Sequence, residues 1–432
     1  MRTTTDAVEF HSARGRHLFV VDGSRIYDLP EDLDLDDAGF NRLIAALSPL
    51  GTRRIDGTPL EPPPLQSLSL NLAQRCNLGC SYCYADTGHF GSVPMTMSWE
   101  VARAAIDRLV DGARPEAEIA IGFMGGEPFL ARGLLHRAVE YAEERALLAG
   151  RRVAFSVTTN ATLLRDEDVA LMAAHRFTVA ISIDGPPDVH DALRPDAKGR
   201  GTYARVMAAL ERFARIGRPR RLEARVTVTP RSGPLLRLLE HLHSLGFDEI
   251  GFAPVLVAPD PTTAIADFDG LLAEMISCGE ATLTAWREGR ALPFSNLTTA
   301  LQEVDRGTHR PYPCGAGAAY MSVHADGTLY SCHRLVGEAE HAMGSVLTRV
   351  NDLARAAHLS RRHVDTQEPC RTCWARYLCG GGCYHEVDRA GRLACGYIRG
   401  WLTWCLRVHA ELSGYRAKYP DQSYSSVREA TL

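Results

Sequence analysis

Three cysteines lie close together in the stretch LNLAQRCNLGCSYCYADTG, namely Cys76, Cys80 and Cys83. Thiolates hold iron–sulfur clusters in proteins, and a 4Fe–4S cluster usually takes four of them. Three thiolates from one loop would bind three irons and leave the fourth iron open to a substrate or cofactor. Zinc is the competing interpretation, but zinc motifs usually pair CxxC with a second pair nearby, and none is close here. The spacing therefore predicts a redox cluster with one open iron.

Seven more cysteines lie between residues 314 and 395, at spacings that also suit metal or iron–sulfur ligation. Written out, the array is Cys314-x12-Gly327-x4-Cys332, then Cys370-x2-Cys373-x5-Cys379-x3-Cys383, then Cys395. A pair of structural zinc sites is the alternative interpretation of these spacings. Of the twelve cysteines only Cys278 and Cys405 stand outside both groups. Cys405 lies in the apolar run WLTWCLRV, which predicts a buried core thiol.

The composition is that of a globular protein. The 432 residues are 45% hydrophobic and 23% charged, which allows a sizeable core and two or three domains. The formal net charge of −4 gives no electrostatic reason to expect nucleic-acid binding. No apolar run approaches a membrane span, and the first residues lack the apolar stretch of a signal peptide. We therefore expect a cytoplasmic protein without a membrane or nucleic-acid partner.

Strands alternate with helices about six times between residues 66 and 305. The expected strands are Ser67–Leu72, Glu118–Met124, Val153–Thr158, Thr178–Ile183, Leu222–Val228 and Glu249–Pro254. The expected helices are Trp99–Val110, Leu134–Leu148, Asp166–His175, Tyr203–Ile216, Leu235–Leu245 and Ile265–Arg287. This alternation implies βα units around a parallel sheet. Six units, instead of the eight of a full barrel, predict a partial (β/α)6 barrel with its site at the carboxyl ends of the strands.

Smaller segments flank the predicted barrel. Residues 1–65 are expected to form an α+β module, with a hairpin turning at Asp22-Gly23 and a helix over 37–47. A proline-rich linker ends this module. Residues 306–412 are rich in Cys and Gly and poor in long periodic elements, as in small domains where bound clusters replace a core. A last helix is expected over 400–412, and residues 413–432 form a polar tail.

Three predicted strands end in residues suited to ligand binding. Gly125-Gly126-Glu127-Pro128 follows the second strand, Thr158-Thr159-Asn160 ends the third, and Ser182-Ile183-Asp184-Gly185 ends the fourth. Each tract alone could be an ordinary turn. Glycine lets a main chain approach a ligand closely, and carboxyl ends of parallel strands share one rim. Together they favour a binding site beside the three-cysteine loop.

The CxxxCxΦC loop, with aromatic Tyr82, resembles the signature of the radical S-adenosylmethionine (SAM) superfamily. The resemblance implies that SAM chelates the open iron and is cleaved by one electron to a 5′-deoxyadenosyl radical. It also implies SAM contacts from Tyr82, Gly125, Gly126, Glu127, Pro128, Asn160 and Ser182, with Glu127 holding the amino group and Tyr82 against the adenine. The tract SIDGPPDVHDALRP resembles peptide-modifying members. Its His190, Asp191 and Arg194 either face substrate or brace the loop, and bracing is favoured for His190 and Asp191.

The seven-cysteine array resembles the SPASM domain, which implies two auxiliary 4Fe–4S clusters and three clusters in all. The resemblance assigns Cys370, Cys373, Cys379 and Cys395 to the distal cluster, and Cys314, Cys332 and Cys383 to the proximal one. Some relatives supply a further cysteine where this chain has Tyr320. The proximal cluster then has an open iron, or a distant residue such as Cys278 or Cys405 completes it.

SPASM domains accompany enzymes that modify ribosomally made peptides. The runs CGAGAAYMSVHADGTLYSCHRLVGE, CRTCWARYLCGGGCYHEV and ACGYIRGWLTWCL resemble maturation enzymes of quinohemoprotein amine dehydrogenase, which join Cys sulfur to Asp or Glu side-chain carbons. The implied partners are a peptide or small protein, such as the small subunit of that dehydrogenase, and an electron donor such as flavodoxin or ferredoxin. Residues 1–65 are then a leader-binding module or a plain extension.

Several alternatives stay open at this stage. Sulfatase-maturing dehydrogenases, which make formylglycine, share the barrel and the cysteine array. Other maturases close carbon–carbon or carbon–oxygen crosslinks. A non-catalytic iron–sulfur or zinc scaffold would turn over no SAM. No catalytic base can be chosen among the 52 acidic residues.

Overall fold

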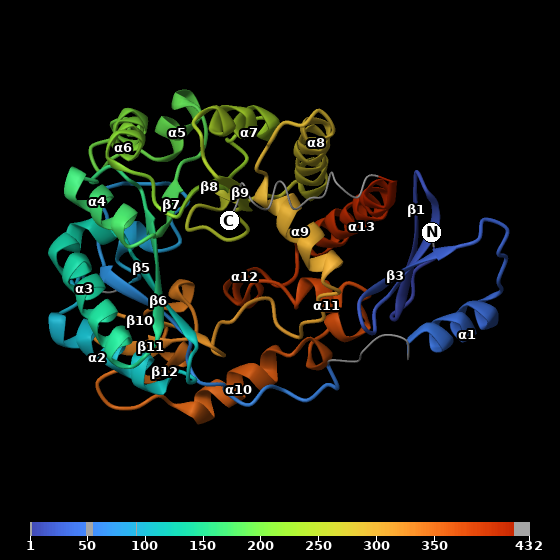
Figure 1. The fold of residues 1–432 in the computed structure, drawn as a ribbon, viewed down its shortest axis with the longest axis horizontal. Helices are drawn as coiled ribbons and strands as arrows, with labels where there is room; N and C mark the ends of the chain where they lie inside the picture. The colour runs from blue at the N-terminus through green and yellow to red at the C-terminus, as the bar shows by residue number, and fades with distance from the viewer. Residues whose placement is uncertain (1, 49–54, 92, 419–432) are drawn as a thin grey trace. The chain divides into compact units, whose positions relative to one another are not determined.

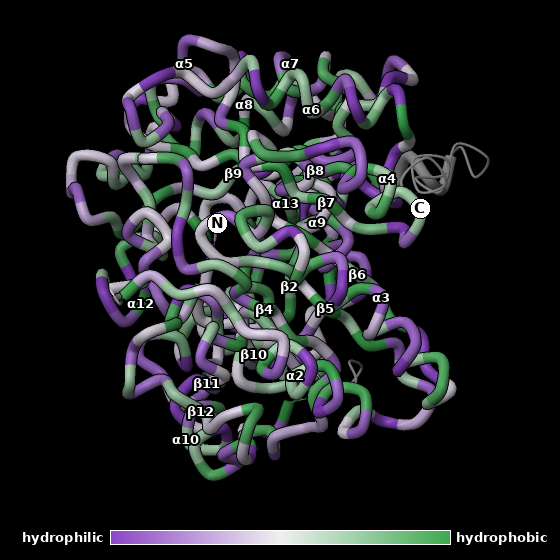
Figure 2. The backbone as a smooth tube through the Cα atoms, turned by 90° about the vertical axis from the view of Figure 1, so that its left-hand side faces the viewer, coloured by the Kyte–Doolittle hydropathy of each residue, from purple (hydrophilic) through white to green (hydrophobic). Residues whose placement is uncertain are grey.

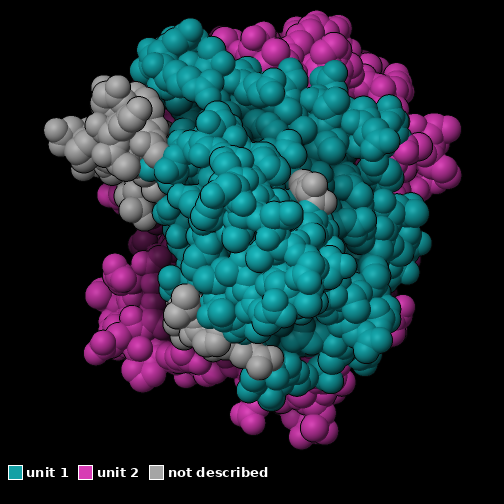
Figure 3. Space-filling view, turned by 90° about the vertical axis from the view of Figure 1, so that its right-hand side faces the viewer, with its two compact units in different colours: residues 1–59, 267–314, 360–432 teal, residues 60–266, 315–359 magenta. Residues whose placement is uncertain are grey.

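The computed structural model describes residues 2–48, 55–91 and 93–418. The chain divides into two compact units, shown in different colours in Figure 3. We call residues 60–266 and 315–359 the sheet unit, and residues 1–59, 267–314 and 360–432 the cysteine-rich unit. The division follows packing, whereas the expected boundaries at 65, 305 and 412 follow composition and motifs, and those boundaries stay a prediction.

The sheet unit is built on one nine-stranded sheet, with strand order β12-β11-β10-β4-β5-β6-β7-β8-β9. Its parallel core confirms the six predicted strands to within one residue at each end: β4 (Ser67–Ala73), β5 (Glu118–Gly125), β6 (Arg152–Thr159), β7 (Thr178–Ser182), β8 (Arg221–Val228) and β9 (Glu249–Pro254). The α/β class and the partial barrel of six βα units are therefore confirmed.

Helices cover one side of these strands (Figure 1). They are α2 (Trp99–Gly112), α3 (Arg132–Leu148), α4 (Asp166–Ala174), α5 (Pro187–Leu193), α6 (Tyr203–Ile216) and α7 (Leu235–Ser244). All except α5 were predicted; α5 is a short helix that begins at a proline, too short to show a clear period. Hydrophilic and hydrophobic stretches alternate along α3 in Figure 2, as expected of helices with one face on a sheet.

The two faces of the sheet differ. Ile121, Phe123 and Phe155 are buried, and the Phe155 ring meets the ring of His175, which ends α4, edge-on at 6.4 Å between centroids. Ser156, the neighbour of Phe155 along β6, is exposed on the opposite face. Neighbouring side chains of a strand point to opposite faces, so the apolar set faces the helices. We call the other, more polar face the inner face.

Three further strands extend the sheet beyond β4. Their residues belong to the region that was expected from the sequence to form the separate cysteine-rich domain. They are β10 (Tyr320–Val323), β11 (Thr328–Tyr330) and β12 (Ala342–Ser345), and β10 pairs in parallel with β4. Helix α10 (Asp352–Arg362) follows them. From α10, the buried Arg355 donates to the carbonyl oxygens of Gly317, Ala318 and Pro63. These bonds hold the start of β10 beside the start of β4.

The cysteine-rich unit contains a three-stranded antiparallel sheet of β1 (Ala7–Ser12), β2 (Gly15–Val20) and β3 (Arg25–Leu29). The predicted hairpin at Asp22-Gly23 is confirmed between β2 and β3, but β1 was not expected. The predicted helix over 37–47 is confirmed as α1 (Asp37–Leu47), and Asp36 caps it by accepting from the Gly39 N–H at 2.6 Å.

Five more helices of this unit are described: α8 (Phe268–Arg287), α9 (Ser295–Asp305), α11 (Arg376–Cys379), α12 (Tyr384–Ala390) and α13 (Cys395–Lys418). Helix α8 starts three residues later than predicted because Asp267 caps it. The predicted last helix over 400–412 is confirmed as α13, which is longer and runs from 395 to 418. Cys405 and Cys278 are both fully buried, which confirms the core thiol at Cys405. Residues 419–432 of the expected tail lie outside the described residues.

Short 3-10 turns connect these elements: η2 (Asp86–Gly88), η3 (Pro128–Ala131), η4 (Pro261–Thr263), η5 (His333–Leu335), η6 (Ala339–His341), η7 (Val364–Thr366) and η8 (Cys370–Thr372). Among the described residues, no helix has both the length and the apolar character that crossing a membrane requires.

Candidate functional site

The three-cysteine loop leaves the end of β4 and is tied to the end of β5. The Gly126 N–H donates to the Ala73 carbonyl oxygen at 2.8 Å, and the Glu127 N–H donates to that of Arg75 at 3.0 Å. A Cβ atom on Gly126 would lie 2.3 Å from the Arg75 carbonyl oxygen. The glycine pair therefore has a structural reason: only glycine lets the end of β5 approach this loop so closely.

The cysteine sulfurs of this loop receive N–H donors. Cys76 Sγ accepts from the Leu78 N–H at 3.4 Å and from the Asn160 amide at 3.7 Å. Burial, with a smaller contribution from the nearby charge of Glu127, raises the pKa of Cys76 to about 12. Burial also raises the pKa of Cys80, against the lowering effect of Arg194. Ligation needs thiolates, so the N–H donors and Arg194 stabilise the form that binds iron.

The three sulfurs of this loop do not all lie within 4.8 Å of one another. Within residues 2–48, 55–91 and 93–418, the one trio of His, Cys, Asp or Glu ligand atoms all within 4.8 Å of one another is Glu338, Glu340 and His341. A single zinc ion draws its sulfur ligands to about 2.3 Å from the metal, so three such sulfurs lie close together. Cys76, Cys80 and Cys83 influence one another electrostatically but are spaced more widely.

Glu127, the predicted holder of the SAM amino group, is fully buried and bonded to β6. Its carboxylate accepts from the Thr159 hydroxyl at 2.7 Å, the Asn160 N–H at 2.8 Å and the Phe129 N–H at 3.2 Å. Burial raises the pKa of Glu127 to about 7, and these donors oppose the rise. Glu127 thus joins the ends of β5 and β6, and its contact with SAM stays a prediction.

Asn160 and Pro128 also lie at this rim. The Asn160 side chain donates to Asn77 Oδ1 at 3.0 Å, and its own Oδ1 accepts from the Thr162 hydroxyl at 2.7 Å. Asn160 therefore links the end of β6 directly to the cysteine loop. Pro128 is buried at the start of η3. Ser182 is the last residue of β7 and is half-buried.

Tyr82 belongs to a buried trio that the sequence did not predict. Its hydroxyl donates to Asp184 Oδ2 at 2.5 Å and accepts from the Arg194 guanidinium. Arg194 lies 3.9 Å from the same carboxylate, whose other oxygen accepts from the Thr227 N–H at 3.0 Å. Burial raises the pKa of Asp184, and Arg194 opposes the rise. The HDALR tract was the available signal for Arg194, but only the fold places it beside Tyr82 and Cys80.

The bracing roles of His190 and Asp191 are confirmed. His190 is fully buried between the Asp184 N–H, at 3.4 Å, and the Thr202 hydroxyl, at 3.0 Å. Burial lowers the pKa of His190 to about 3. Asp191 accepts from the N–H groups of Thr202 and Tyr203, both at 2.7 Å. These contacts fix the turn between α5 and α6.

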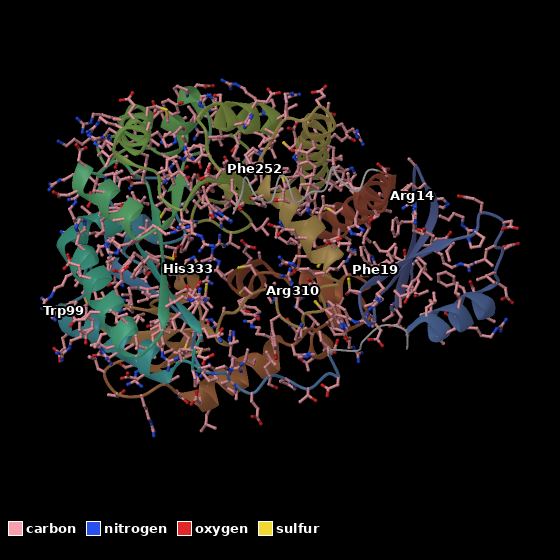
Figure 4. All side chains as sticks on the ribbon, in the orientation of Figure 1. Arg14, Phe19, Trp99, Phe252, Arg310 and His333 are labelled. Carbon is pink, nitrogen blue, oxygen red and sulfur yellow. The ribbon has the colours of Figure 1, made fainter. Side chains whose placement is uncertain are left out.

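Tyr84 brings the first cysteine loop together with the second array. The Arg334 guanidinium lies 5.3 Å from its ring centre, and the His333 ring lies 6.0 Å away. Burial raises the pKa of Tyr84, with smaller contributions from Cys83 and Cys332. Cys332 Sγ also accepts from the Arg334 N–H at 3.5 Å. Tyr84, which follows Cys83, therefore lies beside His333, labelled in Figure 4, and Arg334, which follow Cys332 in the sheet unit.

Tyr320, which stands where some SPASM relatives have cysteine, starts β10. Its hydroxyl lies 2.8 Å from Ser69 Oγ and 3.3 Å from His333 Nδ1. His333 Nδ1 in turn lies 3.8 Å from Cys332 Sγ. The Tyr320 hydroxyl is therefore linked through His333 to the sulfur of Cys332.

In the cysteine-rich unit, the four cysteines predicted for the distal cluster lie together. The pKa of Cys370 is raised to about 11 by burial and by the other three, and is lowered by the Arg392 guanidinium. Backbone N–H groups of Gly381 and Gly382 donate to Cys379. The four residues are Cys370, Cys373, Cys379 and Cys395. Four thiols with N–H donors and one cation fit a 4Fe–4S cluster.

The predicted proximal set draws on both units. Cys314 and Cys383 belong to the cysteine-rich unit, where both act as nearby charges on the Tyr384 hydroxyl, whose pKa burial raises. Cys332 belongs to the sheet unit. Joint ligation by these three cysteines stays a prediction.

Comparisons with known proteins bear on this arrangement. Residues 70–231, which run from β4 past β8, match the family model described as the Radical SAM superfamily. The computed fold superposes on a polyhistidine-tagged anSMEcpe with bound AdoMet at a TM-score of 0.73 and 18% identity, covering 85% of this chain and 98% of the other. The fold is that of the radical SAM enzymes. The matched residues include the loop of Cys76, Cys80 and Cys83, whose three thiols are suitable donors for a 4Fe–4S cluster.

Two further similarities extend beyond the radical SAM domain. The serine-type anaerobic sulfatase-maturating enzyme of Klebsiella aerogenes is 25% identical over 362 residues, which are 79% of this chain and 85% of that protein. SuiB of Streptococcus suis, bound to S-adenosylmethionine, superposes at a TM-score of 0.56 with 16% identity, covering 91% of this chain and 98% of SuiB. The similarity thus includes most of the cysteine-rich unit.

Proposed function

We propose that this protein is a radical SAM enzyme that modifies a ribosomally made peptide or protein by forming thioether crosslinks from Cys sulfur to Asp or Glu side-chain carbons. The observation that carries the proposal is the contact of the Tyr84 ring, next to Cys83, with His333 and Arg334, which follow Cys332. A cysteine of the radical-forming loop and a cysteine of the second array thus share one environment inside the sheet unit. Such a pair suits a reaction in which a radical is made at one cluster and an electron leaves through another.

The first loop supplies the radical chemistry. SAM bound at a cluster on Cys76, Cys80 and Cys83 would supply a 5′-deoxyadenosyl radical that takes a hydrogen atom from the substrate. Gly125, Gly126, Asn160 and Ser182 lie at the adjoining strand ends and are our candidates for positioning SAM, together with Tyr82, Glu127 and Pro128. The buried trio of Tyr82, Asp184 and Arg194 keeps this loop in place against the end of β7.

Thioether formation must also dispose of one electron and one proton. The substrate loses a C–H and an S–H bond and gains a C–S bond. One hydrogen atom leaves as 5′-deoxyadenosine, the thiol proton leaves to a base, and the remaining electron needs an acceptor. Auxiliary clusters on Cys370, Cys373, Cys379 and Cys395, and on Cys314, Cys332 and Cys383, would provide it, which makes three 4Fe–4S clusters in all.

The partners follow from this chemistry. The substrate is a peptide or small protein, with the small subunit of a quinohemoprotein amine dehydrogenase as the leading candidate. A flavodoxin or ferredoxin in the cytoplasm would deliver the electron that starts each turnover. The sheet of β1, β2 and β3 with α1 is our candidate for binding a leader segment.

A sulfatase-maturing activity is the second candidate, because the Klebsiella aerogenes protein and anSMEcpe share most of this chain's length. It would oxidise one Cys or Ser to formylglycine and form no crosslink. Tyr320 favours the thioether, because sulfatase-maturing relatives usually carry a cysteine there. In this chain the Tyr320 hydroxyl is bonded to Ser69 and close to His333.

Anaerobic reconstitution with iron, sulfide, dithionite and SAM tests the proposal. We expect 5′-deoxyadenosine and a peptide product that has lost two hydrogens, keeps its sulfur and no longer reacts with iodoacetamide. An aldehyde that reacts with a hydrazine would support the sulfatase-type activity. A product that has lost two hydrogens but still has a free thiol and no aldehyde would indicate a carbon–carbon or carbon–oxygen crosslink. Cluster-loaded protein that makes no 5′-deoxyadenosine would instead be an iron–sulfur scaffold.

A further inference from the structure

The inner face of the sheet unit carries a cation on β8, Arg225, that forms no ion pair with any described residue. Arg225 lies between Ala224 and Val226, which are buried on the helix-facing side. Its side chain therefore points to the inner face, because neighbours along a strand point to opposite faces. Arg225 is exposed, and its guanidinium forms no ion pair or hydrogen bond with any residue in the described ranges.

Of the charged groups near Arg225, Arg221 and Asp184 are bonded to other residues, and Glu223 forms no ion pair with Arg225. Arg221, on the same face of β8, donates to Glu249 Oε1 on β9 at 2.6 Å. Glu223 is partly buried, and burial together with Glu249 raises its pKa, against the lowering effects of Arg225 and Arg221. The Asp184 carboxylate accepts hydrogen bonds from the Tyr82 hydroxyl and from the Thr227 N–H. Arg225 thus lies among acids that are paired with other groups or lie beyond ion-pair distance.

The neighbours of Arg225 across the sheet leave it uncovered. In the register, Ser182 of β7 stands opposite Arg225 on one side and Gly251 of β9 on the other. The interiors of filled βα barrels carry layers of bulky branched side chains. Here the side chains beside Arg225 are those of Ser182 and Gly251, which are too small to cover the guanidinium. A ligand group could therefore reach the guanidinium from the inner face.

Arg225 also lies near the correct end of the sheet. It is level with Ser182, the last residue of β7, and Thr227, two residues later, contacts the Asp184 loop. Ligands of parallel α/β sheets bind at the carboxyl ends of the strands. The strands β7, β8 and β9 that frame this position are adjacent in Figure 1.

We propose that Arg225 binds a carboxylate of the substrate, namely the Asp or Glu side chain that receives the crosslink. A guanidinium offers two parallel N–H donors that match a carboxylate, which fixes both position and orientation. The inference rests on the proposed function and narrows it, since it assigns an acidic acceptor residue. A Ser or Cys converted to formylglycine has no carboxylate for Arg225 to hold.

Two small probes test the proposal without turnover: N-acetylglutamate N-methylamide and its glutamine counterpart, titrated calorimetrically into reconstituted, SAM-loaded protein. We expect the wild type to bind the glutamate probe about tenfold more tightly, a difference of about 1.4 kcal/mol. Arg225→Gln should abolish this preference, and Arg225→Lys should keep part of it. Arg152→Gln, a matched change of an 81% exposed arginine at the start of β6, should leave the preference unchanged.

Three results would overturn the inference: equal binding of both probes by the wild type, an undiminished preference in Arg225→Gln, or a loss of SAM affinity in Arg225→Gln with the probe preference intact. The last result would assign the guanidinium to the carboxylate of SAM. The absence of 5′-deoxyadenosine would contradict the proposed function, while the probe preference can still be measured.

Discussion

The loop of Cys76, Cys80 and Cys83 follows a strand of a nine-stranded sheet, whereas Cys370 and Cys379 lie on helical turns of three or four residues. Cys373 follows the first of these turns, and Cys395 starts α13. The first group is held by bonds from other strand ends, such as Gly126 to Ala73. The second group has little regular structure of its own. We therefore expect the sheet to hold the first group in place without a cluster, and a cluster bound at the second group to contribute more to stability.

The largest expected effect is on radical formation. Cys80→Ala should reduce 5′-deoxyadenosine formation by more than about 1,000-fold, because SAM cleavage depends on the cluster that this thiolate holds. Far-UV circular dichroism should stay unchanged, since the sheet holds the loop without the cluster. If the variant lost its secondary structure together with its activity, the first loop would also depend on its cluster for folding, which would contradict the proposed difference between the two cysteine groups.

Removing a thiol from the second group should instead lower stability. We expect Cys370→Ala to lose about 5–10 °C in Tm in the cluster-loaded protein, because metal binding and folding are coupled where short turns carry the ligands. Iron content should fall by about one cluster. Cys405→Ala is the control: this fully buried thiol lies in α13, and its removal should leave the iron content unchanged. Equal iron in Cys370→Ala and the wild type would rule out a cluster at this site.

Arg194 belongs to the buried trio beside the first cysteine loop. Arg194→Met leaves the buried Asp184 carboxylate without its cation, so we expect a loss of about 3 kcal/mol in the free energy of unfolding. Arg237→Ala removes an arginine from an exposed ion pair with Asp188 and should cost less than about 1 kcal/mol. Urea denaturation of the cluster-free proteins measures both values. Similar losses in both variants would show that the trio contributes no more than a surface pair.

The smallest effect concerns pH. His190 has a pKa lowered by burial to about 3, below its usual 6.5, so the unfolded chain binds the proton more tightly. Its contribution to stability is complete above pH 6.5 and is lost as the pH falls from there toward 3, by about 1.4 kcal/mol per pH unit. Urea denaturation at pH 7 and 5.5 should therefore show a smaller decrease for His190→Gln than for the wild type. Identical decreases would contradict a neutral buried His190.

The sequence predicted the parallel strands and most helices well, because hydrophobic periodicity is a local property. It missed β10 to β12 as part of the sheet, since their pairing with β4 joins segments about 250 residues apart. It also placed the start of α13 too late, because Cys395 belongs to a helix and to a cysteine spacing at once.

The candidate site shows the same limit. Cysteine spacing identified both groups, but the contact of Tyr84 with His333 and Arg334, and that of Tyr82 with Asp184 and Arg194, depend on tertiary folding. Periodicity and spacing carry no information about which side chains from distant loops meet. These residues could only be found in the folded chain.

Transfer of deuterium from substrate to 5′-deoxyadenosine tests the central claim most directly. The substrate peptide would carry deuterium on the side-chain carbons of its Asp and Glu residues, with a second preparation labelled at the β-carbon of Cys. We predict deuterium in 5′-deoxyadenosine from the Asp- or Glu-labelled peptide alone, because the radical attacks the carbon that receives sulfur. Deuterium from the Cys β-carbon would contradict thioether formation and indicate a formylglycine-forming enzyme.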